Sequence, residues 1–333
     1  MMLNSEIRAA GIIGTGSYLP DIVLTNGYFE ERLDTSDEWI VSRTGIRERR
    51  KADDCIAASD MATYAALKAI EDANVAPEDI DMIIVATVTP DMLFPSTACI
   101  VQKNIGAINA SAFDISAACS GFIYGLSIAE KFIKAGNAKY ILVIGAEALS
   151  KITDYSDRNT CILFGDGAGA AVVAKVEESM GILAAYTGSD GRGGELLKLP
   201  AGGSRLPASC ETIKNSLHFV KMDGSEVFKF AIKIMGEAAE KALEMCGLNK
   251  EDIDYLIPHQ ANIRIIESAT KRLKIPQDKV FINIDKYGNM SAASIAVALD
   301  EANKAKKLNK GDIVVLVGFG GGLTWGAVVL KWA

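Results

Sequence analysis

The chain has 333 residues, of which 49% are hydrophobic and 23% are charged. This composition is typical of a globular protein and excludes a disordered, collagen-like or coiled-coil chain. The 35 Lys and Arg residues against 42 Asp and Glu residues give a formal net charge of −7, which argues against nucleic-acid binding. At this length a single hydrophobic core is unusual, so we expect two core units.

The sequence also indicates a compartment. No basic segment followed by an apolar stretch opens it, so we expect no secretory signal. The long apolar run 313–330 contains five glycines, which favours two buried strands joined by a loop over a membrane span. The six cysteines lack the spacing of a zinc site or a disulfide framework. We therefore expect a cytoplasmic protein with reduced thiols and no membrane contact.

Short apolar runs alternate with helical patterns along the chain. The first half predicts, in order, strand Ile7–Gly14, helix Ser59–Ala73, strands Met82–Thr87 and Ala112–Ile115, helix Gly121–Lys134, and strands Tyr140–Gly145 and Ala168–Val176. The second half predicts strand Ile182–Tyr186, the surface loop Thr187–Ser209, helix Ser225–Cys246, strand Tyr255–Ile257, helices Ile263–Leu273 and Ala292–Lys304, and strands Ile313–Val317 and Thr324–Leu330. This alternation predicts mixed sheets covered by helices, in a layered α/β protein.

The order of elements reflects an internal repeat. Shifted by 173 positions, Ala65–Ile84 lies on Ala238–Ile257 without a gap, and ten of the twenty residues are identical. Chance would give about one or two identities at average composition. The same shift places Tyr140–Gly145 on Ile313–Gly318. We therefore predict two copies of one unit, residues 1–177 and 178–333.

Two residues have surroundings that favour chemistry. Cys119 lies where a predicted strand turns through small residues into a helix, and the amides and positive end of that helix would stabilise a thiolate. His259 follows a buried strand, in the kind of loop where α/β proteins place functional groups. The other histidine, His218, lies in the alternating segment Ser216–Lys221, which predicts a half-buried strand residue.

The repeat suggests a third residue. The shift of 173 places Cys119 on position 292, directly after Tyr287–Ser291. If a pseudo-twofold axis relates the copies, Asn289 faces Cys119 across that axis, and His259 lies on the neighbouring strand end. Taken alone, Asn289 is more typical of a helix cap or a turn.

Several longer motifs add to these single residues. They are Thr35–Ile40 (TSDEWI), Arg43–Ile46 (RTGI), Phe94–Cys99 (FPSTAC), Ser116–Gly121 (SAACSG), Phe164–Gly169 (FGDGAG), Pro258–Arg264 (PHQANIR), Gly288–Ser294 (GNMSAAS) and Phe319–Gly326 (FGGGLTWG). With these motifs in order and without large gaps, the chain resembles the β-ketoacyl-acyl carrier protein synthase III family, the initiating condensing enzymes of bacterial type II fatty-acid synthesis.

The resemblance implies the thiolase fold, a duplicated five-layer α/β/α/β/α arrangement with pseudo-twofold symmetry. The N-terminal half would carry the nucleophilic cysteine, and the C-terminal half the histidine and asparagine. The catalytic triad would be Cys119, His259 and Asn289, and the oxyanion hole would be the amides of Cys119 and Gly321.

Other site residues follow from the same resemblance. Those matching CoA-binding positions are Trp39, Arg43, Thr44, Arg158 and Asn262, and those matching the acyl pocket are Phe94 and Phe319. Carrier-protein binding is assigned to Arg264, Lys271 and Arg272 from the positive charge they place near His259. Phe94 would close the pocket of the partner subunit in a homodimer. Two departures from the family pattern, Tyr287 for a frequent histidine and Met290 for a common threonine, leave the triad unchanged.

The implied reaction is a decarboxylative Claisen condensation in two half-reactions. An acyl-CoA would acylate Cys119, and malonyl-acyl carrier protein would then supply the enolate, with no metal or redox cofactor. The basic residues around His259, and the five within 43–51, would attract these acidic partners; the alternative is two solvated charged faces. A condensing enzyme of secondary metabolism and a Cys–His–Asn thioester hydrolase stay as alternatives, and the length and branching of the primer stay open.

Overall fold

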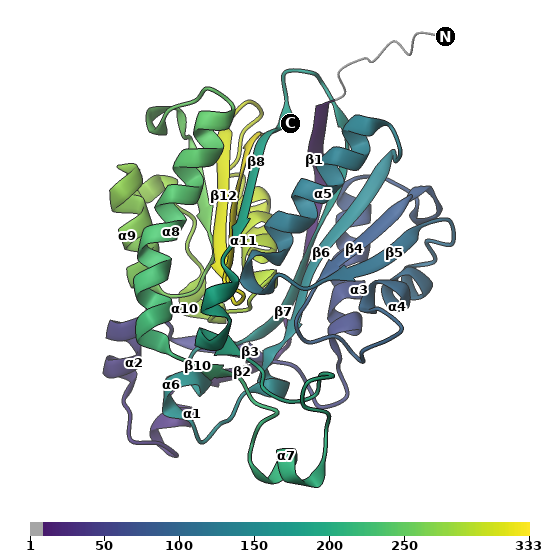
Figure 1. Ribbon diagram of the computed structural model, residues 1–333. Helices are drawn as coiled ribbons and strands as arrows, with labels where there is room; N and C mark the ends of the chain where they lie inside the picture. Colours follow the sequence, from purple (N-terminus) through teal and green to yellow (C-terminus); the bar gives the residue numbers. More distant parts are fainter. Residues whose placement is uncertain (1–8) are drawn as a thin grey trace.

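The computed structural model describes residues 9–333, so residues 7 and 8 of the predicted strand Ile7–Gly14 lie outside it. The first sheet has the order β1 (Ala9–Tyr18), β7 (Asp166–Val176), β6 (Tyr140–Ala148), β4 (Met82–Ala86) and β5 (Ser111–Ile115). The second sheet has the order β8 (Gly181–Ser189), β13 (Thr324–Lys331), β12 (Ile313–Gly320) and β11 (Tyr255–Pro258). The sheets lie side by side in Figure 1.

The two sheets repeat one pairing pattern. Strand β4 runs parallel to β6, as β11 does to β12, and the other pairs are antiparallel in both sheets, apart from β4–β5. Where Ile83 of β4 pairs with Ala112 of β5, the equivalent Leu256 forms only a single parallel bridge with Val280. The predicted duplication therefore appears in the topology, with the fifth strand of the second sheet reduced to one bridge. Residue 178 lies in the turn between β7 and β8.

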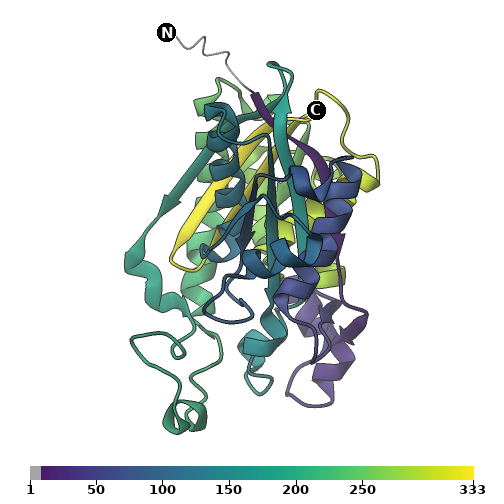
Figure 2. The same cartoon turned by 90° about the vertical axis from the view of Figure 1, so that its right-hand side faces the viewer.

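Helices form three layers around the sheets (Figures 1 and 2). Helices α5 (Gly121–Ala135) and α11 (Ala293–Lys304) share one core with both sheets and lie between them. Helices α3 (Ala58–Asp72) and α4 (Thr97–Ile105) pack on the outer face of the first sheet, and α8 (Gly224–Met245) and α9 (Ile263–Leu273) on that of the second. This is the expected α/β/α/β/α arrangement.

Small residues set the spacing between these layers. A Cβ atom on Gly16 of β1 would lie 2.4 Å from Ala65 O and Ala69 N of α3, so only glycine lets strand and helix approach this closely. The alanine-rich inner face of α3 is fully buried at this contact. The apolar, small-residue composition of both elements therefore explains why they pack backbone to backbone.

The remaining short elements lie mainly toward one end of the molecule, below the sheets in Figure 1. They are β2 (Ile22–Thr25), α1 (Asn26–Glu30), α2 (Asp37–Thr44), β3 (Glu48–Lys51), α6 (Arg158–Cys161), β9 (Leu197–Lys198), α7 (Cys210–Lys214), β10 (Lys221–Met222) and α10 (Ile284–Tyr287).

Two local predictions are wrong. The segment predicted as a strand around His218 forms turns before β10 begins, and the imidazole Nε2 hydrogen-bonds Thr212 Oγ1 at 2.9 Å. The predicted loop Thr187–Ser209 is partly regular, because β8 continues to Ser189, which pairs with Thr324 of β13. Strand pairing across the sheet overrides the glycine-rich local sequence in the second case.

Candidate active site

Cys119 lies in a tight turn at the start of α5. A short 3₁₀-helix, Ala118–Ser120, leads directly into α5, and Cys119 is 8% exposed. Ala118 has a φ of +44°, a left-handed conformation that costs energy for a side chain other than glycine. Ser120 Oγ hydrogen-bonds Ala117 O and Thr324 Oγ1, both at 2.8 Å, which ties the turn to β13. The predicted strand-to-helix turn is therefore present, and Thr324 of the second half holds it in place.

The end of β12 brings Cys119 and His259 together. A Cβ atom on Gly320 would lie 2.5 Å from Cys119 N, and one on Gly318 would lie 3.2 Å from His259 Cβ. His259 N donates to Val317 O at 2.7 Å. Both residues thus pack against the last residues of one strand.

The His259 imidazole is buried among apolar groups. The residue is 1% exposed, and its ring lies edge-on to Phe319, with centroids 5.9 Å apart. Neither ring nitrogen has a hydrogen-bond partner among the described residues. Burial lowers the pKa of His259 to about 3, because the charged form is poorly solvated there. At neutral pH the ring is therefore uncharged, with one nitrogen that donates and one that accepts.

Asn289 is held by its backbone and by its side-chain oxygen. Its N–H donates to Leu163 O at 2.9 Å, and its carbonyl accepts from Gly165 N at 3.0 Å. Its Oδ1 accepts from the Ser291 N–H at 2.8 Å. Because Oδ1 is engaged with Ser291, the Nδ2 amide is the end of the side chain directed away from that bond.

The starts of α5 and α11 face each other. A Cβ atom on Gly121 would lie 3.5 Å from Ala292 Cβ, so the position related to Cys119 by the 173-residue shift lies against the helix that Cys119 precedes. The Ser291 hydroxyl, just before Ala292, lies close enough to the Cys119 thiol to lower its pKa, although it hydrogen-bonds no group among the described residues. The structure therefore places Cys119 and His259 against one strand end, and Asn289 in the segment that faces the start of α5, from parts far apart in the chain.

The electrostatics of Cys119 differ from the sequence prediction. Burial raises the pKa of the Cys119 thiol to about 12, the carboxylate of Glu147 acts in the same direction, and the Ser291 hydroxyl acts against it. A stable thiolate at the helix start was predicted, but desolvation outweighs the helix end in this buried turn. Sequence reasoning also missed Glu147 and Ser291, although the 173-residue shift places Glu147 on Gly320, which touches Cys119.

The predicted CoA-binding residues group around Trp39, which is 36% exposed on α2. The guanidinium carbons of Arg43 and Arg158 lie 5.9 Å and 5.3 Å from its ring centroid. Thr44 differs, because it is buried and its hydroxyl donates to Ile40 O at 2.7 Å. Asn262 caps α9 by accepting from Arg264 N, and its Nδ2 donates to Arg43 O, both at 2.9 Å.

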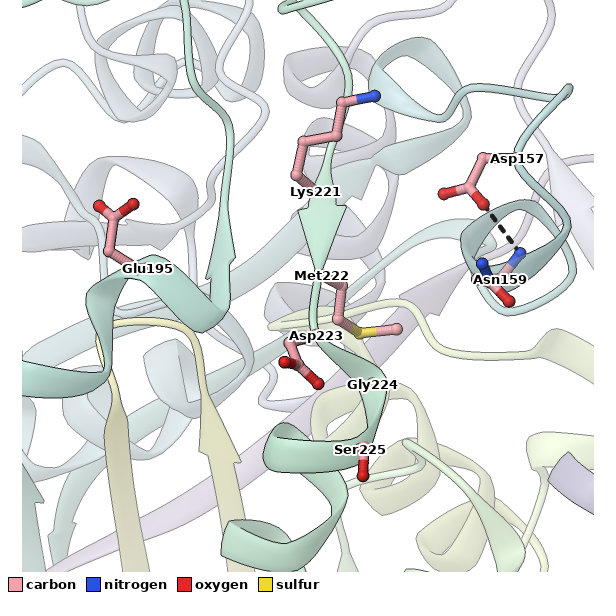
Figure 3. A pocket seen from close by; sticks show the side chains of 8 residues that line it. All are labelled: Asp157, Asn159, Glu195, Lys221, Met222, Asp223, Gly224 and Ser225. Carbon is pink, nitrogen blue, oxygen red and sulfur yellow. Dashed lines mark hydrogen bonds between the residues drawn. The ribbon is translucent and has the colours of Figure 1, made fainter.

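A cleft of about 680 Å³ lies beside Arg158. The residues that line it are Asp157, Asn159, Glu195, Lys221, Met222, Asp223, Gly224 and Ser225 (Figure 3). Asp157 and Asn159 flank Arg158 at α6, and 221–225 lead into α8. The lining is mostly polar and includes none of Cys119, His259 and Asn289.

The two predicted acyl-pocket residues lie in different settings. Phe94 is 83% exposed, and its neighbours Met92 and Leu93 are exposed as well. Phe319 is buried between the His259 ring and Phe230. Gly321 lies at the turn after β12, where a Cβ atom would be 3.2 Å from Leu197 O.

The predicted basic surfaces are smaller than the sequence suggests. Arg264 and Lys271 are exposed, but Arg272 forms ion pairs with Glu240 at 2.7 Å and with Glu237 at 3.4 Å, on α8. Arg49 is buried, and it is wrong to count it as a surface charge. Its guanidinium donates to Leu24 O, Asn26 Oδ1 and Ile162 O and lies over the Phe29 ring.

Within residues 9–333, no group of His, Cys, Asp and Glu side chains has the arrangement of a metal site. None of the helices described there has the length and apolar character needed to cross a membrane.

Comparisons with known proteins agree with this architecture. Models of 3-oxoacyl-[acyl-carrier-protein] synthase III match residues 113–191 and, for its C-terminal part, 243–332. The β-ketoacyl-[acyl-carrier-protein] synthase III of Caldanaerobacter subterraneus subsp. tengcongensis is 64% identical, over 98% of this chain and 99% of that protein. The crystal structure of 3-oxoacyl-[acyl-carrier-protein] synthase III from Aquifex aeolicus is 51% identical, covers 97% of this chain and 100% of its own, and has a TM-score of 0.90.

A neighbour from another pathway is similar as well. The priming β-ketosynthase of the R1128 polyketide biosynthetic pathway is 35% identical, with a TM-score of 0.91 over 99% of this chain and 98% of its own. The fold and the buried cysteine at the helix start define a thiolase-fold condensing acyltransferase. Within that class, the chain belongs to the β-ketoacyl-[acyl-carrier-protein] synthase III family of initiating condensing enzymes of fatty-acid synthesis.

Proposed function

We propose that the protein condenses an acyl-CoA primer with malonyl-acyl carrier protein to give 3-ketoacyl-acyl carrier protein, CO₂ and CoA. The observation that supports this proposal is the packing of Cys119 and a neutral His259 against the end of β12, with Asn289 in the segment that leads to Ala292, opposite the start of α5. In the division proposed from the repeat, the nucleophile comes from residues 1–177 and the other two from 178–333.

In the first half-reaction, the Cys119 sulfur attacks the acyl-CoA thioester and forms an acyl-enzyme. The oxyanion of the tetrahedral intermediate accepts hydrogen bonds from the backbone N–H groups of Cys119 and Gly321. Gly320, packed against Cys119 N, supports this role by placing the turn that carries Gly321 beside the nucleophile.

In the second half-reaction, malonyl-acyl carrier protein loses CO₂ and leaves an enolate. The enolate oxygen accepts hydrogen bonds from the His259 N–H and the Asn289 amide. The buried, uncharged imidazole suits this role, because it keeps a donor at neutral pH and is not consumed by another partner among the described residues. The resulting carbanion attacks the acyl-enzyme, and the reaction needs no metal or redox cofactor.

The CoA moiety binds at the surface around Trp39 and Arg158. The adenine ring stacks on the exposed indole, and the guanidinium groups of Arg43 and Arg158 bind phosphates. Thr44 and Asn262 contribute by fixing α2 and α9, since their side chains are engaged inside the protein. The polar cleft beside Arg158 provides space for part of the bound CoA.

We propose a cytoplasmic homodimer. Phe94, Leu93 and Met92 are exposed apolar residues, and β5 is an edge strand of the first sheet. A second subunit would bury the apolar residues and cover the unpaired strand edge. Phe94 of one subunit then closes the acyl pocket near Phe319 of the other. Light scattering should give about twice 35.5 kDa, and Phe94→Asp should shift the mass toward that of one chain. An active wild-type monomer would exclude this assembly.

Carrier protein docks on the exposed face of α9. Arg264 and Lys271 supply positive charge there, whereas the charge of Arg272 is paired with Glu240 and Glu237 at the surface of α8. Acidic partners are attracted by such rim charges mainly through faster association.

A product assay separates this function from its alternatives. Release of labelled CO₂ with 3-ketoacyl product is expected of the condensing enzyme, whereas free acid from acyl-CoA alone would indicate a thioester hydrolase. The similarity to the R1128 priming enzyme favours a second candidate, an initiating enzyme of secondary metabolism, and the preferred primer and carrier protein distinguish the two. His259→Ala and Asn289→Ala should still form acyl-Cys119 but lose decarboxylation by about 10²- to 10³-fold.

A further inference from the structure

The buried carboxyl group of Glu147 has no role in the reaction as described so far. It lies at the end of β6 and is fully buried. Its oxygens accept hydrogen bonds from Thr89 Oγ1 at 2.7 Å and from Val88 N at 3.2 and 3.3 Å. A carboxyl group held in the interior with no basic partner is costly and calls for a reason.

The Ser291 hydroxyl acts on both Glu147 and the nucleophile. It lies close enough to the Cys119 thiol and to the Glu147 carboxyl group to lower the pKa of each. Its oxygen is buried and hydrogen-bonds no group among the described residues, so its capacity to donate and to accept is unused in this structure. Its backbone is fixed, with φ at +46° and its N–H bonded to Asn289 Oδ1.

The repeat explains how the carboxyl group reaches this place. Glu147 and Gly320 are equivalent under the 173-residue shift. Gly320 touches the backbone of Cys119 at the start of α5, and a Cβ atom on Gly145, two residues before Glu147 on β6, would lie 2.2 Å from Ala292 O at the start of α11. Each central strand therefore ends against the helix of the opposite half, and only the first half carries an acid there.

We propose that Glu147, acting through Ser291, accepts the proton of the Cys119 thiol during acylation. The Cys119 S–H bond breaks and its proton passes to Ser291 Oγ, while the Ser291 proton passes to a Glu147 oxygen. The sulfur electron pair forms the new thioester bond, and the departing CoA sulfur takes up one proton by the reverse path. The inference rests on the proposed function, and it leaves His259 and Asn289 for the enolate.

The charges around Glu147 fit a proton acceptor. Burial raises its pKa to about 7, and hydroxyl and amide donors of Thr89, Val88, Ser291 and Ala292 act against burial. Among the described residues these donors, with the Thr87 hydroxyl, surround the carboxyl group, and the titratable group coupled to it is Cys119. Acylation should therefore accelerate as the pH rises through about 7 and Glu147 ionises.

The test follows acyl-Cys119 formation from acetyl-CoA by intact mass, in single turnovers between pH 5.5 and 9. Glu147→Gln and Ser291→Ala should each slow acylation by about 10²-fold, in the range of a general base, and should lose the rise near pH 7. Ser291→Ala keeps the N–H that holds Asn289. The double variant should be no slower than either single one, because the two residues form one path.

Controls separate this inference from others. Glu130→Gln removes a different buried carboxylate, on α5 and paired with Lys134, and should acylate at the wild-type rate. Decarboxylation of malonyl-carrier protein by pre-acylated enzyme should be unchanged in Ser291→Ala. Wild-type pH dependence in both Glu147→Gln and Ser291→Ala, whatever the rate, overturns the relay. A wild-type enzyme that forms no acyl-Cys119 would instead contradict the proposed function.

Discussion

Gly320 and Cys119 are in direct backbone contact across the two halves of the molecule. A Cβ atom on Gly320 would lie 2.5 Å from Cys119 N and 3.0 Å from Ala118 Cβ. The nucleophile of the first half is therefore positioned by the central strand of the second half, and any atom added at Gly320 must displace the turn that carries the cysteine.

Gly320→Ala should displace the proposed oxyanion hole. We expect acylation of Cys119 to fall by about 10²-fold, as for the loss of an oxyanion donor, and the free energy of unfolding to drop by about 1–3 kcal/mol from overpacking. Acylation by mass and denaturant unfolding check both. Gly191→Ala is the control, since a Cβ atom there meets nothing within 4 Å. An active, stable Gly320→Ala enzyme would show that the turn adapts.

Cysteine labelling should follow exposure and not catalytic role. Cys55 and Cys210 are exposed, whereas Cys119 is buried and its thiol pKa is raised to about 12. A hydrogen bond with Asp53 raises the pKa of Cys55, so iodoacetamide should modify Cys210 first, then Cys55, and Cys119 last. Acyl-CoA should nevertheless modify Cys119 alone. Rapid alkylation of Cys119 at neutral pH would mean that the helix end outweighs burial after all.

Arg264 and Arg272 should respond differently to charge reversal. Arg264→Glu should raise the KM for malonyl-carrier protein several-fold and weaken its salt dependence, with acylation by acyl-CoA little changed. Arg272→Glu should mainly lower stability, because it places a carboxylate beside Glu240 and Glu237. Adding Glu240→Arg should restore part of that stability. Equal effects of both charge reversals on the KM for malonyl-carrier protein would show that Arg272 also binds the carrier protein.

His259 should make the protein sensitive to acid. Its pKa is about 3 in the fold against an ordinary value of 6.5, so the unfolded chain binds the proton more tightly. The stabilisation from the neutral ring is complete above pH 6.5 and is lost as the pH falls toward 3, by roughly 2 kcal/mol at pH 5. Lowering the pH from 8 to 5 should therefore cost wild type about 2 kcal/mol more stability than it costs His259→Asn, in which the contribution of Glu147 is unchanged, with His218→Asn as the matched comparison. The same slope in His259→Asn would assign acid sensitivity to other groups.

Much of the fold could be predicted because the sequence contains two copies of one folding unit. The repeat of Ala65–Ile84 in Ala238–Ile257 indicated two related halves, and it also indicated that Cys119 and Asn289 approach each other. The ends of the central strands could not be read in the same way. Strand β6 was predicted to stop at Gly145 and β12 at Val317, but each continues for three residues, because pairing with β7 and β13 overrides the weak local preference for a strand.

Those unpredicted strand ends carry Glu147 and Gly320, so the parts of the site that the sequence missed share one cause. The sequence also does not show which charged side chains are buried. Arg49 stands in a run of basic residues, and its partners come from Leu24, Asn26 and Ile162. Only the tertiary structure shows that such a charge is internal.

Glu147→Gln should stabilise the protein at high pH. The carboxyl pKa is about 7 in the fold against an ordinary value of 4.5, so the folded state binds the proton more tightly than the unfolded chain. The stability linked to this proton is complete below pH 4.5 and is lost as the pH rises through 7. That loss amounts to roughly 2 to 3 kcal/mol between pH 5 and pH 8.

Glutamine keeps the shape and carries no charge at any pH, so the variant should gain stability over wild type at pH 8 and much less at pH 5, measured by denaturant unfolding. Glu130→Gln provides the comparison, because Glu130 is equally buried but bonded to Lys131 and Lys134. Its loss should lower stability at both pH values. If the substitution lowers activity and raises stability, the wild-type protein keeps a destabilising charge because the reaction needs it. If Glu147→Gln were less stable than wild type at pH 8, the carboxylate would be a structural group, and its burial beside Cys119 would need no catalytic reason.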